Sequence, residues 1–164
     1  MAGSPIPVIL AQVGLSVLPV LIFLFGLEPI DTYKLLTLGR VLRSVAIGCA
    51  VALVCYAANT GIYSLGVISP HAWARFGAPV IEEVAKGLYV AWLLRSNRVG
   101  FMVDTAILGF AVGAGFAVVE NLSYIPDLSA SALATSAIRG LGTAMMHGGA
   151  TAIFGIDCEN TSSG

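Results

Sequence analysis

The fold is decided by residues 105–125, TAILGFAVGAGFAVVENLSYI, an apolar run in which Glu120 is the one charged residue. A run of about 20 apolar residues is long enough to cross the hydrocarbon core of a bilayer as a helix. Small residues recur at every fourth position, at Gly109, Gly113 and Ala117, and such a stripe lets a second helix approach closely. The stretch therefore predicts a transmembrane helix that packs against other helices.

Four further apolar runs lie on either side of this one. Together the five expected helices cover residues 6–27, 41–58, 76–94, 105–125 and 137–156. A sixth apolar piece, 62–68, is too short to span a bilayer and fits a loop or an interfacial segment better. No stretch alternates in the way that a membrane barrel requires. We predict an all-α polytopic transmembrane helix bundle that forms a single integral membrane domain over residues 1–164.

The composition of the whole chain agrees with this prediction. Of its 164 residues, 57 % are hydrophobic and 10 % are charged, and the mean hydropathy is +0.91. Soluble domains carry about 25 % charged residues. A net charge of −1 without a run of Lys or Arg argues against a nucleic-acid binder, and three cysteines at apolar positions argue against a disulfide scaffold. The remaining class is a protein that uses lipid as its solvent.

The basic residues predict how the chain is oriented in the membrane. The loops after the first and third spans are flanked by Lys34, Arg40, Arg43, Arg95 and Arg98, whereas the other two loops have Arg75 and Arg139. Loops rich in Lys and Arg stay in the cytoplasm. We therefore expect the N-terminus outside and the C-terminus inside.

Several ionisable residues lie inside the expected spans. The third span carries Glu82, Glu83 and Lys86, the fourth carries Glu120 followed by Asn121, and the fifth carries His147. An isolated charge at the bilayer centre costs roughly 2.5–3.5 kcal/mol, so these side chains should face the bundle interior and meet partners. Counted from the outer face, the glutamates lie roughly 8–10 Å deep and the histidine roughly 15 Å deep. We expect one shared polar site in the outer half of the bilayer.

Each of these residues also has a purely structural interpretation. Glu82 and Lys86 lie four residues apart and would form an ion pair on one helix face, which leaves Glu83 without a basic partner nearby in the sequence. Glu120 would be a hydrogen-bonding residue near the interface, and a lone histidine in an apolar helix is more often a satisfied core residue. Three carboxylates and a histidine at matched depth favour a functional site.

Carboxylates and imidazole are the bases and ligands of hydrolytic sites. One glutamate can take a proton from water, while His147 and the Thr151 hydroxyl, one turn apart, can donate hydrogen bonds to an oxyanion. No H-E-x-x-H or G-x-S-x-G motif is present, which disfavours a zincin or a serine hydrolase. The main alternative is a proton- or cation-coupled transporter or channel that uses the same buried groups, although we find no inverted repeat. A non-catalytic membrane scaffold is the third interpretation.

Three short motifs resemble those of a known family. Residues 82–86 (EEVAK) look like an E-E-x-x-K element, residues 116–121 (FAVVEN) like F-x-x-x-E-N, and residues 147–151 (HGGAT) like H-x-x-x-[TD]. In this order, each on its own span, they closely resemble the PrsW family of intramembrane proteases. That family is related to the CAAX prenyl protease and bacteriocin-processing group. The resemblance covers roughly residues 76–156.

The resemblance implies a glutamate-dependent endopeptidase, usually classed as a metalloprotease, that cleaves membrane-anchored proteins such as anti-sigma factors. A multi-pass protein of a prokaryotic plasma membrane is the corresponding expectation. The family usually has further spans, and this chain ends with residues 157–164 soon after its fifth, so we expect that it is truncated.

By residue, the resemblance implies that Glu82 activates water, with Glu83 beside it. Glu120 would be a second base or a metal ligand, and His147 would bind the metal or stabilise the oxyanion. Lys86, Asn121 and Thr151 would support them, although Thr151 stands where the motif also allows Asp. The metal would be Zn²⁺, and a directly held water without a metal is the alternative.

Overall fold

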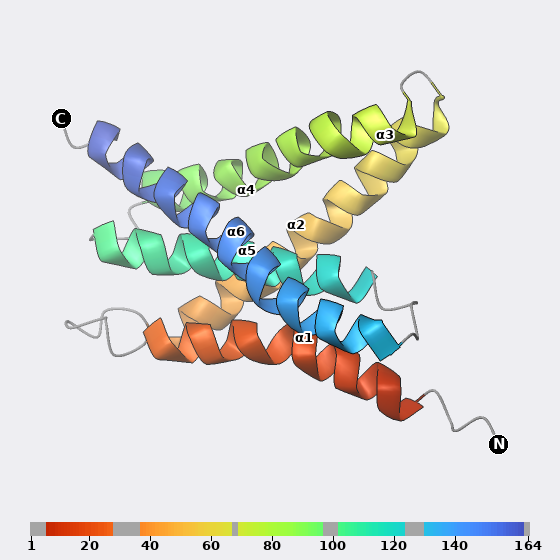
Figure 1. Cartoon of the computed structure of the whole chain (residues 1–164). Coiled ribbons are helices and arrows are strands. Elements are labelled where there is room, and N and C mark those ends of the chain that lie inside the picture. The colour runs from red at the N-terminus through yellow and green to blue at the C-terminus, as the bar shows by residue number, and fades with distance from the viewer. Residues whose placement is uncertain (1–5, 28–36, 67–68, 97–101, 124–129, 163–164) are drawn as a thin grey trace.

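The computed structural model describes residues 6–27, 37–66, 69–96, 102–123 and 130–162, and these ranges contain helices and no strand (Figure 1). The elements are α1 (Ile6–Leu27), α2 (Leu38–Ser64), α3 (Pro70–Ala72), a π-helical turn η2 (Trp73–Gly77), α4 (Ala78–Arg95), α5 (Met102–Ser123) and α6 (Ala130–Ser162). The predicted all-α class is confirmed. Lys34 and Arg98, on which the expected orientation partly rests, lie outside the described residues.

Two helices are longer than their apolar runs. α2 continues to Ser64, so the expected loop or interfacial segment begins inside this helix, while residues 67–68 are not described. Thr60 Oγ1 donates to Tyr56 O at 2.8 Å and Ser64 Oγ to Gly61 O at 2.6 Å, so these hydroxyls are satisfied within the helix. α6 begins at Ala130 and ends at Ser162. An apolar run marks only the part of a helix that is suited to lipid, and both of these helices extend beyond their runs.

The outer surface of the bundle is apolar. Large side chains such as Leu53 and Val54 of α2 and Leu88 of α4 are exposed. By length and composition, α2 and α5 are long and apolar enough to cross a membrane. An apolar exterior of this kind suits contact with lipid.

α5 occupies the centre of the bundle, between α6 and α2 (Figure 1). A Cβ atom on Gly113 would lie 2.2 Å from the carbonyl oxygen of His147 in α6, and one on Gly115 would lie 2.1 Å from that of Val45 in α2. Both neighbours therefore pack backbone to backbone against α5, which only glycine permits. The predicted small-residue stripe thus sets the distance between α5 and the segment of α6 that carries His147.

Candidate active site

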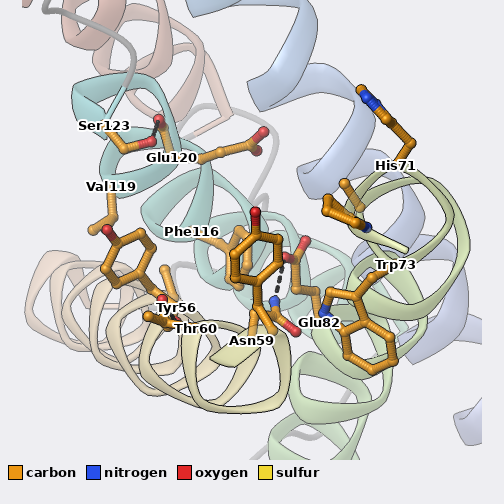
Figure 2. A pocket seen from close by; sticks show the side chains of 14 residues that line it. Tyr56, Asn59, Thr60, His71, Trp73, Glu82, Phe116, Val119, Glu120 and Ser123 are labelled. Atoms are coloured by element: carbon orange, nitrogen blue, oxygen red, sulfur yellow. Dashed lines mark hydrogen bonds between the residues drawn. The ribbon is translucent and has the colours of Figure 1, made fainter. Parts of the chain in front are cut away.

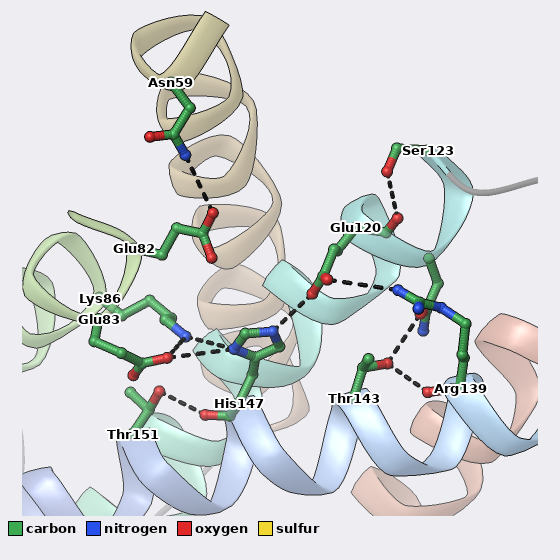
Figure 3. Close-up of polar contacts among 11 residues, drawn as sticks. Asn59, Glu82, Glu83, Lys86, Glu120, Ser123, Arg139, Thr143, His147 and Thr151 are labelled. Carbon is green, nitrogen blue, oxygen red and sulfur yellow. Dashed lines mark hydrogen bonds and ion pairs between the residues drawn. The ribbon is translucent and has the colours of Figure 1, made fainter. Parts of the chain in front are cut away.

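Three helices bring the predicted polar residues together (Figure 3). α4 supplies Glu83 and Lys86, α5 supplies Glu120, and α6 supplies His147. Their side chains form one chain of contacts from α4 through α6 to α5. The expectation that these groups meet is therefore fulfilled by the geometry of the bundle.

Lys86 is completely buried, and its ammonium group has three partners. Nζ lies 2.5 Å from Glu83 Oε1, 2.8 Å from His147 Nδ1 and 4.6 Å from the centroid of the Phe116 ring. A buried charge requires such compensation because its hydration is lost. Glu83, whose side chain is 46 % exposed, is the anionic member of this group.

The contact with Lys86 fixes the proton on the imidazole of His147. An ammonium group can donate a hydrogen bond but cannot accept one, so Nδ1 is the acceptor. The proton of the neutral ring is therefore on Nε2, which donates to Glu120 Oε2 at 2.7 Å. The ring also packs against Phe116, with 5.1 Å between the ring centroids. His147 is thus presented as a hydrogen-bond donor toward Glu120.

Arg139 is a site residue that the sequence analysis treated as a loop charge. It lies within α6, and its Nη2 is 3.6 Å from Glu120 Oε1, so Glu120 is held between Arg139 and His147. A regular spacing could have revealed it: Arg139, Thr143, His147 and Thr151 recur every four residues and lie on one side of the helix.

The three supporting residues have different surroundings. Lys86 is at the centre of the site, as described above. Asn121 is buried and accepts a hydrogen bond from Thr143 Oγ1 at 2.9 Å, while its Nδ2 has no partner among the described residues. The Thr151 hydroxyl donates to the carbonyl oxygen of His147 at 2.7 Å. That hydrogen bond lies within α6, and this geometry gives no support to the expected donation from Thr151 to an oxyanion.

Glu82 is directed away from Lys86. The spacing of four residues predicted a Glu82–Lys86 pair, but Lys86 contacts Glu83 instead, at a spacing of three. Both spacings place side chains side by side on a helix, and the contacts with His147 and Phe116 select the second. Glu82 Oε1 accepts a hydrogen bond from Asn59 Nδ2 of α2 at 3.2 Å. Asn59 lies just beyond the expected helix 41–58 and is therefore a second site residue that was not predicted.

A cavity of about 530 Å³ opens beside the site (Figure 2). It lies among α2, α3, η2, α4 and α5, and both Glu82 and Glu120 line it. Aromatic side chains, including Tyr56, Trp73 and Phe116, form much of the remaining wall. The cavity is therefore a largely apolar chamber that contains two carboxyl groups from different helices.

The described residues do not form a ready metal site. They contain no group of three or more His, Cys, Asp or Glu side chains arranged to hold a metal ion. His147 and Glu120, which the sequence offers as ligands, are hydrogen-bonded to each other at 2.7 Å. Two ligands of one tetrahedral zinc ion stand roughly 3.3 Å apart, because zinc–ligand bonds are about 2.0–2.1 Å long. As arranged, these groups bind each other.

Comparison with known proteins identifies one family. A family model described as PrsW family intramembrane metalloprotease matches residues 37–159. No curated protein and no solved structure matches the chain. The matched residues run from the start of α2 to the last turns of α6 and include every predicted site residue.

Proposed function

The chain belongs to the PrsW family of intramembrane metalloproteases, and on this basis we propose that it hydrolyses peptide bonds in membrane-anchored proteins. The cavity lined by Glu82 and Glu120 is the proposed place of reaction, in the outer half of the bilayer. The family match and the apolar exterior support a membrane hydrolase, and nothing in the described residues favours the transporter alternative.

One observation carries this proposal. Glu82 and Glu120 reach the same cavity from α4 and α5, and Glu120 is hydrogen-bonded to a histidine whose proton is on Nε2. Hydrolysis of an amide needs a base for water, a donor for the oxyanion and an acid for the leaving amine. Glu82 and Glu120 line the cavity, and His147 lies behind its wall, hydrogen-bonded to Glu120, so candidates for all three roles lie in or next to the cavity.

We assign the role of base to Glu82. Asn59 holds its Oε1, so its second oxygen remains for a water molecule in the cavity. The carboxylate takes a proton from this water while the water oxygen bonds to the carbonyl carbon of the substrate. The protonated carboxyl group then gives the proton to the amide nitrogen, the C–N bond breaks, and Glu82 returns to its starting form.

His147 is the proposed oxyanion donor. Its Nε2–H points toward Glu120 in the absence of substrate and would transfer its hydrogen bond to the developing oxyanion. Lys86 keeps the proton on Nε2 by occupying Nδ1, and Arg139 holds Glu120 beside the ring. Glu83 in turn neutralises Lys86.

The family description implies a metal, and the donor arrangement described above does not fit one. A metal between His147 and Glu120 requires these side chains to separate and Nε2 to lose its proton. The steps proposed here use only the side chains of this chain and a water molecule.

The proposal is tested with the purified protein in detergent and a panel of tagged single-pass membrane proteins, with anti-sigma-factor types included first. We expect cleavage of at least one of them, and a loss of at least a hundredfold in Glu82→Gln and His147→Ala. Asp157→Asn, which removes a carboxylate from the exposed surface of α6, is the matched control and should cleave normally. Equal cleavage by all variants would refute the site.

A further inference from the structure

A second cavity, of about 700 Å³, is lined by residues from the first part of α2, the last part of α4 and the first part of α5, whereas Glu82 lies near the start of α4 and Glu120 near the end of α5. Its rim carries Arg40 and Arg43 of α2 together with Tyr89 and Trp92 of α4, and its floor includes the buried side chains of Leu93 and Leu108. No residue lines both cavities. Along α2, Arg43 and Asn59 are separated by roughly 24 Å at 1.5 Å per residue. The second cavity is therefore a separate site.

Two arginine side chains line this cavity. No described Asp or Glu lines it. Arg43 is exposed, and its side chain has no ion pair or hydrogen bond with other residues of the described part of the chain. A guanidinium group presents a planar fork of donors that matches the oxygens of a phosphate group. The rim is thus suited to a phosphate or phosphodiester anion.

The other side chains indicate that this anion is attached to a lipid. Tyr89 and Trp92 stack on each other with 5.7 Å between ring centroids, and Trp92 is 50 % exposed. Such aromatic residues gather at the level of lipid headgroups. Leu42 of α2 and Leu88 of α4, which adjoin Arg43 and Tyr89 in the sequence, are exposed and offer apolar surface to acyl chains. Arginines, interfacial aromatic residues and exposed leucines together match the amphipathic character of a phospholipid.

We propose that this cavity binds the headgroup of an anionic phospholipid through Arg43 and Arg40. On the predicted orientation, this end of the bundle faces the cytoplasmic leaflet, where anionic lipids are attracted to basic residues. The site is independent of the proposed hydrolysis, because none of its residues belongs to the catalytic cavity.

Native mass spectrometry of the full chain tests this proposal. The detergent-solubilised protein is titrated with phosphatidylglycerol and, separately, with phosphatidylcholine of the same acyl chains. We expect one phosphatidylglycerol to be retained with at least tenfold preference. Arg43→Gln should weaken its binding about tenfold, and Arg43→Lys should weaken it less, because it keeps the charge but loses the fork.

Arg95→Gln is the matched control. It removes one positive charge, as Arg43→Gln does, and Arg95 lies at the end of α4 that carries Trp92 but does not line this cavity. Its binding of phosphatidylglycerol should change less than twofold. Equal retention of the two lipids, or equal losses in Arg43→Gln and Arg95→Gln, would overturn the proposal. Competition by millimolar glycerol 3-phosphate would identify a soluble phosphate as the ligand instead, and exclusion of lipid by a second copy of the chain would identify an interface.

Discussion

The ammonium nitrogen of Lys86 lies 2.8 Å from Nδ1 of His147, and this contact determines which nitrogen of the ring carries the proton. Because lysine can only donate, Nε2 becomes the donor and meets Glu120 at 2.7 Å. A buried cation on α4 thereby sets the hydrogen-bonding direction between α6 and α5. Lys86, the last residue of the motif at 82–86 on α4, therefore determines the tautomer of the histidine on α6.

Lys86→Met should reverse this direction. Without the ammonium group, Nδ1 can carry the proton and donate to Glu83 Oε1, which lies 3.4 Å away. We expect a fall of about a hundredfold in the rate of hydrolysis, the size typical of a lost oxyanion donor. The ¹⁵N shifts of labelled histidine should change from the Nε2–H to the Nδ1–H tautomer, with His71→Gln used to assign the two rings. If the tautomer is unchanged in Lys86→Met, Lys86 does not determine which nitrogen of His147 carries the proton.

Arg139→Gln should lower kcat with little effect on KM. The guanidinium group is 3.6 Å from Glu120 and both side chains are partly exposed, so the pair contributes about 1 kcal/mol at most. We expect a rate roughly five times lower, because Glu120 is then held by His147 alone. Arg139→Lys should restore part of the rate, and Arg75→Gln, an exposed charge elsewhere, should have no effect. A change confined to KM would indicate substrate binding instead.

Gly113→Ala tests the close packing behind the site. Its new Cβ would meet the carbonyl oxygen of His147 at 2.2 Å, and a backbone atom cannot move aside without moving α6. We expect a loss of about 1–3 kcal/mol in the free energy of unfolding, measured in mixed micelles, together with reduced hydrolysis. Gly142→Ala has no atom within 4 Å of its new Cβ and should raise stability by about 0.5–1 kcal/mol. Similar effects of the two substitutions would contradict the backbone contact.

Chelation tests the donor arrangement. Since His147 and Glu120 bind each other, we expect the purified protein to retain hydrolysis after dialysis against EDTA and to contain less than stoichiometric zinc by elemental analysis. Activity that disappears with the chelator and returns with Zn²⁺ would place a metal between these two residues and change the proposed mechanism.

Hydropathy and spacing were enough to predict the helical class and the meeting of Glu83, Glu120 and His147. Placing these residues in lipid costs free energy, so similar depths along their helices indicated that they contact one another. The stripe of Gly109 and Gly113 likewise predicted a close helix contact, because small residues have few other reasons to recur at that interval. The five-span arrangement and its orientation stay predictions.

The pairing of Lys86 could not be predicted from one helix. Spacings of three and four residues are equivalent on an isolated helix, and the choice of Glu83 over Glu82 depends on His147 and Phe116 from other helices. Arg139 was missed for a related reason. Arg139 lies near the start of the expected helix 137–156 and was counted with the preceding loop, whereas α6 begins at Ala130, so this residue lies well inside the helix and beside Glu120.

The uncharged part of α6 can be compared with the thickness of the bilayer. Between Arg139 and Asp157 it carries no Lys, Arg, Asp or Glu, and this interval measures roughly 27 Å at 1.5 Å per residue. The hydrocarbon core is about 30 Å thick. On the same scale, His147 lies roughly 12 Å from Arg139. A lipid layer that matches this interval would fix the depth of the histidine, and therefore the height on a substrate at which cleavage takes place.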